Sequence, residues 1–306
     1  MLGDAFGKKT ISVADNSSRL RDTILEHWSR RGSGEPPVRD EMFRASSLGK
    51  LCPRLYALAV ADNFSIQESF EAEKLWIFGI GTAYHSLFQS EILPAIPEGV
   101  FRGWWERLSS ADQYGQMFHG GSIDAPGIAK GWRDRPNESA TYVEMTGVIP
   151  EYRFSGHWDG VLVWDDFTEI FELKSINERG FARVDPFMGF GPREDHIEQV
   201  HAYMWMSGLD RARIVYALKG DKGIVESVAE HPVLRDEKIV NGIKSKLNVT
   251  IQALDDVYEA IDCGAERSEM VIPDRLPKCD KKSAYRTKYC PGRDYCFPKR
   301  KKKTSK

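Results

Sequence analysis

Two neighbouring apolar segments, residues 154–164 and 169–176, carry charged side chains in their interiors, and this combination restricts the fold more than any other feature of the chain. Both segments are rich in β-branched and aromatic residues, and an Asp-Asp pair separates them, so they predict a β-hairpin. Because side chains alternate faces along a strand, Glu172 and Lys174 should share one face. With the turn centred on the Asp-Asp pair, the numbers of paired residues sum to about 331–333.

This register places Asp159 across from Glu172 to Lys174, and directly opposed residues have Cβ atoms ~4.5–5.5 Å apart. Two carboxylates at that spacing can share one Mg²⁺ at ~2.0–2.1 Å per oxygen, with the lysine free to orient or deprotonate a water molecule. The alternative is a ladder of cross-strand ion pairs on a solvated face. The apolar residues around these charges argue against that alternative, because buried charges are costly unless paired or bound to metal.

Four short motifs together resemble a known family. The segment SGHWDG at residues 155–160, followed by ELKS at 172–175, resembles the core motif of the PD-(D/E)XK nucleases. GTAYH at 81–85 and QVHAY at 199–203 resemble two motifs of the RecB-like branch of this superfamily, and the order of the motifs is that of the family. The resemblance covers roughly residues 44–298.

The resemblance implies an α/β fold of the restriction-endonuclease type, with a central mixed β-sheet flanked by helices, a helical N-terminal part and a C-terminal metal-cluster region. We expect a single nuclease domain over residues 1–298, in which residues 44–60 and 273–298 are joined by the cluster. Residues 94–138 form an irregular insertion that either covers the core or touches substrate, and residues 299–306 form a flexible basic tail.

A divalent metal, Mg²⁺ or Mn²⁺, is implied by the same resemblance, as one ion or two. Its ligands would be His85, Asp159, Glu172 and the backbone carbonyl of Leu173. Considered without the family, His85 lies among apolar helix residues, where a packed histidine is the more common outcome. Glu144 precedes the hairpin and is either near the metal or a solvated charge.

Further roles follow for residues around the metal. Lys174 would activate the attacking water, while Gln199 and Tyr203, one helical turn apart, would position the DNA backbone or the lysine. His196 lies one turn before Gln199 and could face the same site; outside the family, Gln199 and Tyr203 would be ordinary helix residues. The implied catalytic residues are Asp159, Glu172, Lys174, Gln199 and Tyr203.

Four of the five cysteines follow a pattern in which Cys52 stands early and Cys279, Cys290 and Cys296 stand late. This layout resembles the iron–sulfur subset of RecB-like exonucleases, found among CRISPR-associated and phage enzymes, where four thiolates hold a [4Fe–4S] cluster. The gap between Cys279 and Cys290 is longer than is common there. A four-cysteine zinc site and buried free thiols are the alternatives. Cys263 follows a predicted helix and is expected to stand apart.

Charge is distributed unevenly along the 306 residues. The tail 299–306 holds six Lys or Arg, whereas the other residues carry 37 basic and 45 acidic groups. Such a tail is either an arm that attracts phosphates or a solvated terminus. The acidic body disfavours tight nonspecific duplex binding. The resemblance implies DNA contacts from Arg54 and Tyr203. A local basic channel could be formed by Arg44, Lys50, Arg54, Lys174 and Lys219.

The implied function is a metal-dependent DNA exonuclease that hydrolyses phosphodiester bonds at the ends of single-stranded DNA, with 5′→3′ polarity favoured by analogy. Such an enzyme would act in recombination, repair, phage replication or CRISPR adaptation, with a possible protein partner and an open oligomeric state. A catalytically silent DNA-end-binding module is the main alternative, and a zinc-stapled RNA-processing or structural factor is another. With neither a secretion signal nor an apolar run of ~20 residues, the expected location is the cytoplasm of a bacterial, archaeal or phage-infected cell.

Periodicity predicts the remaining elements. Helices are expected at 15–31, 55–60, 71–93, 193–207 and 233–261, and strands at 211–218 and 224–229. Ser46 and Ser47 are candidate caps for the second of these helices.

Overall fold

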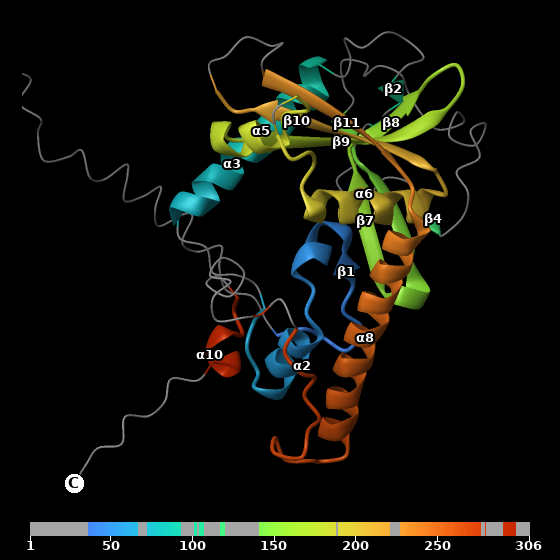
Figure 1. Cartoon of the computed structure of the whole chain (residues 1–306). Coiled ribbons are helices and arrows are strands. Elements are labelled where there is room, and N and C mark those ends of the chain that lie inside the picture. Colours follow the sequence, from blue (N-terminus) through green and yellow to red (C-terminus); the bar gives the residue numbers. More distant parts are fainter. Residues whose placement is uncertain are drawn as a thin grey trace, which may run out of the picture.

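The computed structural model describes residues 36–66, 72–92, 101–102, 104–106, 117–119, 141–187, 189–220, 227–276, 279 and 290–297, drawn as coloured ribbons in Figure 1. The predicted helix at 15–31, most of the insertion and the basic tail lie outside these residues. The elements in chain order are β1 (Phe43–Arg44), η1 (Ala45–Lys50), α2 (Pro53–Ala61), α3 (Ala72–Leu87), η2 (Phe88–Ile92), β2 (Phe101–Arg102), β3 (Trp104–Glu106), β4 (Met117–His119), β5 (Thr141–Val143), β6 (Met145–Ile149), η4 (Pro150–Tyr152), β7 (Phe154–Trp158), β8 (Gly160–Val163), β9 (Thr168–Ile176), α5 (Glu178–Val184), α6 (Glu194–Ser207), β10 (Arg211–Leu218), β11 (Val228–Leu234), α8 (Glu237–Asp262) and α10 (Arg293–Cys296). The chain is an α/β protein with mixed sheets flanked by helices, as predicted.

A five-stranded mixed sheet contains the predicted hairpin. Its order is β11-β10-β9-β8-β2, in which β9 and β10 are parallel and the other pairs antiparallel. In the β8–β9 pair Val161 lies opposite Ile170 and Val163 opposite Thr168, so paired numbers sum to 331 and the predicted register is confirmed. A four-stranded sheet of order β1-β7-β6-β4 and a two-stranded sheet of β3 and β5 complete the strands of the described residues.

The segment predicted as one strand at 154–164 is divided at Asp159, and that prediction was wrong. β7 pairs with β1 and β6 in the four-stranded sheet, whereas β8 pairs with β9 in the five-stranded sheet. Trp158, at the end of β7, is fully buried and its ring lies 5.6 Å from that of Tyr203 in α6. Because the two halves follow different partners, the chain crosses from one sheet to the other at Asp159.

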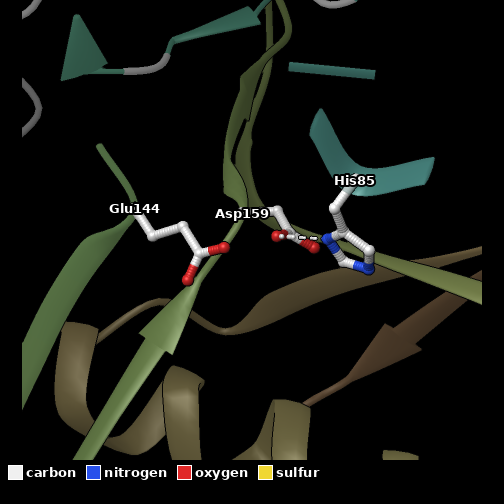
Figure 2. Close-up of side chains that lie close together, drawn as sticks. All are labelled: His85, Glu144 and Asp159. Carbon is white, nitrogen blue, oxygen red and sulfur yellow. Dashed lines mark ion pairs between the residues drawn. The ribbon is translucent and has the colours of Figure 1, made fainter. Parts of the chain in front are cut away.

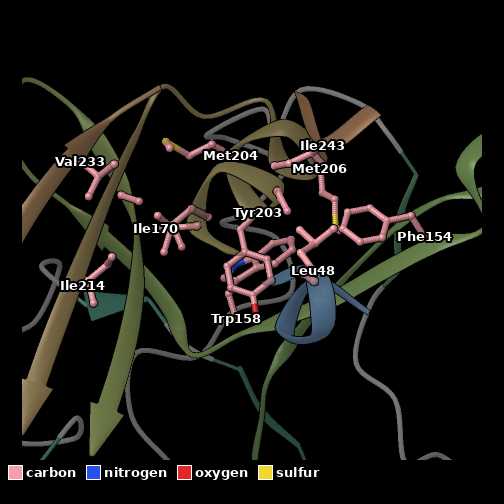
Figure 3. Close-up of a cluster of buried hydrophobic side chains, with 14 of the residues drawn as sticks. Leu48, Phe154, Trp158, Ile170, Tyr203, Met204, Met206, Ile214, Val233 and Ile243 are labelled. Carbon is pink, nitrogen blue, oxygen red and sulfur yellow. The ribbon is translucent and has the colours of Figure 1, made fainter. Parts of the chain in front are cut away.

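Helices α6 and α3 cover opposite faces of the five-stranded sheet. On one face Ile170 packs in the main core with Tyr203 and Met204 of α6 (Figure 3). On the other, Leu173 packs in a smaller cluster against Tyr84 of α3. The two-residue repeat of a strand explains this division, since even-numbered residues of β9 face α6 and odd-numbered residues face α3.

The long helix α8 runs beside α2 at the opposite end of the molecule from β9 (Figure 1). The Asp236 side chain caps α8 by accepting a hydrogen bond from the Lys238 N–H at 2.8 Å. α2 confirms the predicted helix at 55–60, but Ser46 and Ser47 do not cap it. They lie in the preceding 3₁₀-helix η1, and α2 begins with Pro53, whose fixed φ suits the first helical position.

Strand β11 lies later in the chain than predicted, and α8 accordingly begins at Glu237 rather than at residue 233. Buried residues alternate along β11 at Ala229, His231 and Val233, which continues the strand past Pro232. Proline is tolerated because β11 is an edge strand of the sheet that the described residues form. The helices predicted at 71–93 and 193–207 and the strand at 211–218 are confirmed.

Candidate active site

Asp159 lies at the crossing from β7 to β8, and the residue is only 5% exposed. Its Oδ2 accepts a hydrogen bond of 2.6 Å from the backbone N–H of Leu173 in β9. Its Oδ1 lies 3.4 Å from Nδ1 of His85, which α3 carries. Residues from three separate elements therefore meet at one carboxylate.

Glu172 is the centre of a second group of contacts, on the face of β9 that meets α6. Lys174 Nζ donates to Glu172 Oε1 at 2.6 Å, and Gln199 Nε2 donates to the same oxygen at 3.1 Å. Gln199 Nε2 also donates to the hydroxyl of Tyr203, one turn further along α6. The structure thus brings Glu172, Lys174, Gln199 and Tyr203 into one hydrogen-bonded chain.

A cation could be held by His85, Glu144 and Asp159, whose ligand atoms all lie within 4.8 Å of one another (Figure 2). Glu144 stands between β5 of the two-stranded sheet and β6 of the four-stranded sheet. Glu172 is outside this group, and its Oε1 accepts the two hydrogen bonds described above. Carboxylate oxygens suit Mg²⁺ and Mn²⁺, and a nitrogen donor favours Mn²⁺ over Mg²⁺, which prefers oxygen alone.

Burial and charge shift the pKa values of these groups. Burial alone would lower the pKa of His85, but its hydrogen bond to Asp159 and the negative charges of Asp159, Glu172 and Glu144 raise it overall. Burial raises the pKa of Glu172, although the charge of Lys174 opposes the shift. Burial would also lower the pKa of Lys174, but Glu172 and Asp159 outweigh burial and raise it. The raised pKa favours the ammonium form of Lys174.

The sequence suggested that His196 could face the same site, and in the structure its ring contacts Tyr216 of β10. Its Nδ1 lies 2.8 Å from the hydroxyl of Tyr216, and that hydroxyl also accepts a hydrogen bond from the backbone N–H of Arg193. Burial, followed by the positive charge of Lys174, lowers the pKa of His196 to about 3. The ring is thus a neutral neighbour of the lysine.

The four cysteines of the predicted cluster lie close together, although they come from opposite ends of the chain. Burial raises the pKa of Cys290, and negative charge on Cys52, Cys296 and Cys279 raises it further. Cys52 precedes α2, Cys290 precedes α10, and Cys296 is the last residue of α10. Cys263, by contrast, is exposed at the end of α8.

The segment that carries the late cysteines packs on α2. The rings of Phe64 and Tyr295 stack with centroids 4.5 Å apart, and a Cβ on Gly292 would come within 2.8 Å of Leu55. Arg54 donates from Nη1 to the backbone carbonyl of Pro273 at 2.6 Å. This hydrogen bond links α2 to the segment that precedes the late cysteines. A DNA contact from Arg54 remains a prediction.

No family model matches the chain, and no curated protein matches it. Solved structures do show similarity. An alkaline exonuclease from Laribacter hongkongensis is 14% identical with a TM-score of 0.43, over 78% of this chain and 97% of that protein. Its complex with dAMP gives 12% identity and a TM-score of 0.40, over 78% and 98%. A phage-related exonuclease from Haemophilus somnus gives 14% and 0.27, over 35% and 57%. These scores are too low to transfer an activity, so the chemistry of the site must carry the functional conclusion.

Proposed function

We propose that this protein is a metal-dependent DNA nuclease that hydrolyses phosphodiester bonds, acting as an exonuclease on single-stranded ends. The observation that carries the proposal is the convergence of His85, Glu144 and Asp159 beside the Glu172–Lys174 pair. Five ionisable side chains lie together at this site: Glu172 and Lys174 come from β9, and His85, Glu144 and Asp159 come from three other parts of the chain. Such a concentration of charge is costly unless a cation and a polyanionic substrate offset it.

The donor set fits Mg²⁺ or Mn²⁺, held by His85, Glu144 and Asp159, with Glu172 and the Leu173 carbonyl as the further ligands that the family resemblance implies. When bound, such a cation acts as a Lewis acid on the phosphate and lowers the pKa of water. Protonated Lys174 can orient the attacking water and stabilise charge on the phosphate oxygens. Gln199 fixes the Glu172 carboxylate by donating to Oε1.

We further propose that Cys52, Cys279, Cys290 and Cys296 hold a [4Fe–4S] cluster. The effect of the other three thiols on the pKa of Cys290 supports a shared site. A four-cysteine zinc site is the alternative, and metal analysis of the purified protein distinguishes the two.

The test is degradation of end-labelled DNA in Mg²⁺ or Mn²⁺ by the wild type, by Lys174→Ala and by a matched control, Lys238→Ala, in which an exposed lysine of α8 is removed. We expect loss of activity by about 10²-fold or more in Lys174→Ala and none in the control. Circular substrates test the requirement for an end, and the position of the label gives the polarity. A wild type that binds DNA ends but cleaves no substrate would favour the silent binding module.

A further inference from the structure

Lys219 follows β10 and lies beside Gly81, a position of α3 that has no side chain. Its backbone N–H donates to the carbonyl of Ile176 at 2.8 Å, which ties it to the end of β9. A Cβ built on Gly81 would lie 3.4 Å from Lys219 Nζ and 3.6 Å from Ser175 Oγ. An ammonium group and a hydroxyl therefore meet where α3 has no side chain.

The ammonium group of Lys219 makes no ion pair or hydrogen bond with any described residue. Partial burial lowers the pKa of Lys219. Because its ammonium group has no counter-ion among the described residues, it is available to bind an anion. Lys174 differs in this respect, because Glu172 neutralises it.

The position of this group relative to the candidate metal site is set by two regular elements. Gly81 and His85 are four residues apart on one face of α3, a separation of ~6 Å along the axis. Ser175 and Leu173 are two residues apart on one face of β9, a separation of ~6.6 Å. The hydroxyl of Tyr84 donates to the carbonyl of Leu218 at 3.0 Å and holds α3 in this register. Both separations are comparable with that between neighbouring phosphates along a DNA strand.

We propose that Lys219, Ser175 and the bare face at Gly81 form a phosphate subsite, which binds the phosphate adjacent to the one being hydrolysed. The proposal rests on the proposed nuclease function and specifies how the substrate is held. Lys219 Nζ and Ser175 Oγ donate to non-bridging oxygens, and the missing side chain at Gly81 leaves room for them.

Lys219→Ala tests the subsite, with Lys219→Arg to restore the charge and Lys238→Ala as the control. Binding of a single-stranded oligonucleotide is measured by fluorescence anisotropy in EDTA over a range of salt concentrations. We expect weaker binding and a slope of log K against log[salt] that is smaller by about 1. In cleavage assays KM should rise while kcat changes little, and Lys219→Arg should recover most of the loss. An unchanged slope and an unchanged KM would overturn the subsite.

Gly81→Ala separates an effect on DNA binding from an effect on stability. Alanine is the better helix former, and the contacts that its Cβ would make are ordinary ones, so the unfolding temperature should hold or rise. The methyl group narrows the subsite, so DNA affinity should fall. Affinity equal to that of the wild type would count against the proposal.

Two substrates identify which phosphate is bound. A loss confined to 5′-phosphorylated DNA assigns the subsite to a terminal phosphate, and an equal loss on 5′-hydroxyl DNA assigns it to an internal one. A wild type that cleaves DNA while Lys219→Ala behaves identically leaves the nuclease standing and removes the subsite. If the wild type does not bind DNA at all, both proposals fall.

Discussion

The Asp159 carboxylate has two roles on its two oxygens: Oδ2 accepts the Leu173 N–H at 2.6 Å, and Oδ1 faces His85 at 3.4 Å. One oxygen thus holds the crossing strand to β9, and the other belongs to the candidate metal site. The structural role and the ligand role can be separated by mutation, because an amide retains an acceptor oxygen but loses the charge.

Asp159→Asn and Asp159→Ala should both lose divalent-metal affinity and nuclease activity, but only the alanine variant leaves the buried Leu173 N–H without an acceptor. We expect Asp159→Ala to unfold more easily than Asp159→Asn by about 1–3 kcal/mol. Urea unfolding in EDTA measures the stability, and calorimetric titration with Mn²⁺ measures the affinity. Equal stability of the two variants would contradict the structural role.

Glu144→Gln should weaken Mn²⁺ binding, because it removes the negative charge of one of the three candidate ligands. The ligand atoms of these three residues lie within 4.8 Å of one another. Glu151→Gln is the control, since Glu151 is exposed in η4 and outside the group. Removal of the metal with EDTA should abolish activity in both variants, and Mn²⁺ should restore it at a higher concentration in Glu144→Gln. Identical titrations would exclude Glu144 from the site.

Gln199→Ala should destabilise the fold by about 1–3 kcal/mol, because the buried hydroxyl of Tyr203 loses its partner and Glu172 loses a donor. Tyr203→Phe removes the hydroxyl itself. The double variant should therefore cost less than the sum of the two single variants. Additive costs in urea unfolding would show that the two side chains do not interact.

Stability should fall in acid through His196. Its pKa is about 3 in the folded chain and near 6.5 when unfolded, because burial and the charges of Lys174 and Arg193 outweigh the opposing charge of Asp195. The folded state favours the neutral ring, so the contribution is present above pH ~6.5 and is lost as pH falls toward 3. Unfolding midpoints at pH 7.5 and 4.5 should differ less in His196→Asn than in the wild type. An equal difference would place the titrating group elsewhere.

Cys290→Ser should remove the visible absorbance of the purified protein and lower its unfolding temperature. A cluster that joins Cys52 to Cys290 closes a loop of more than 200 residues, which in a chain-entropy model contributes about 5 kcal/mol. Cys263→Ser, at an exposed cysteine, is the matched control and should behave as the wild type. An unchanged spectrum in Cys290→Ser would reject the cluster, and metal analysis would distinguish iron from zinc.

Local patterns predicted the hairpin well. The alternation of apolar residues and the Asp-Asp turn led to the observed β8–β9 register, because a one-residue slip would expose the buried face. Glu172 and Lys174 share a face for the same reason. Gln199 and Tyr203 contact each other because residues four apart are neighbours on a helix.

Other features depend on partners that are distant in the sequence. The break at Asp159 was missed because β7 and β8 are both apolar, and only their pairing with β6 and β9 assigns them to different sheets. The bounds of β11 were predicted too early in the chain because of Pro232. Proline is acceptable only on an edge strand, and which strand lies at an edge depends on the assembled sheet.

By itself, the sequence determined the elements and the residue types of the site, because helix and strand periodicity and turn chemistry act over a few residues. Only the tertiary structure decided that Glu144 joins His85 and Asp159, that Lys174 pairs with Glu172, and that Lys219 lies beside Gly81. Distances between separate elements and the burial that shifts a pKa arise from packing, and packing is set by the whole chain at once.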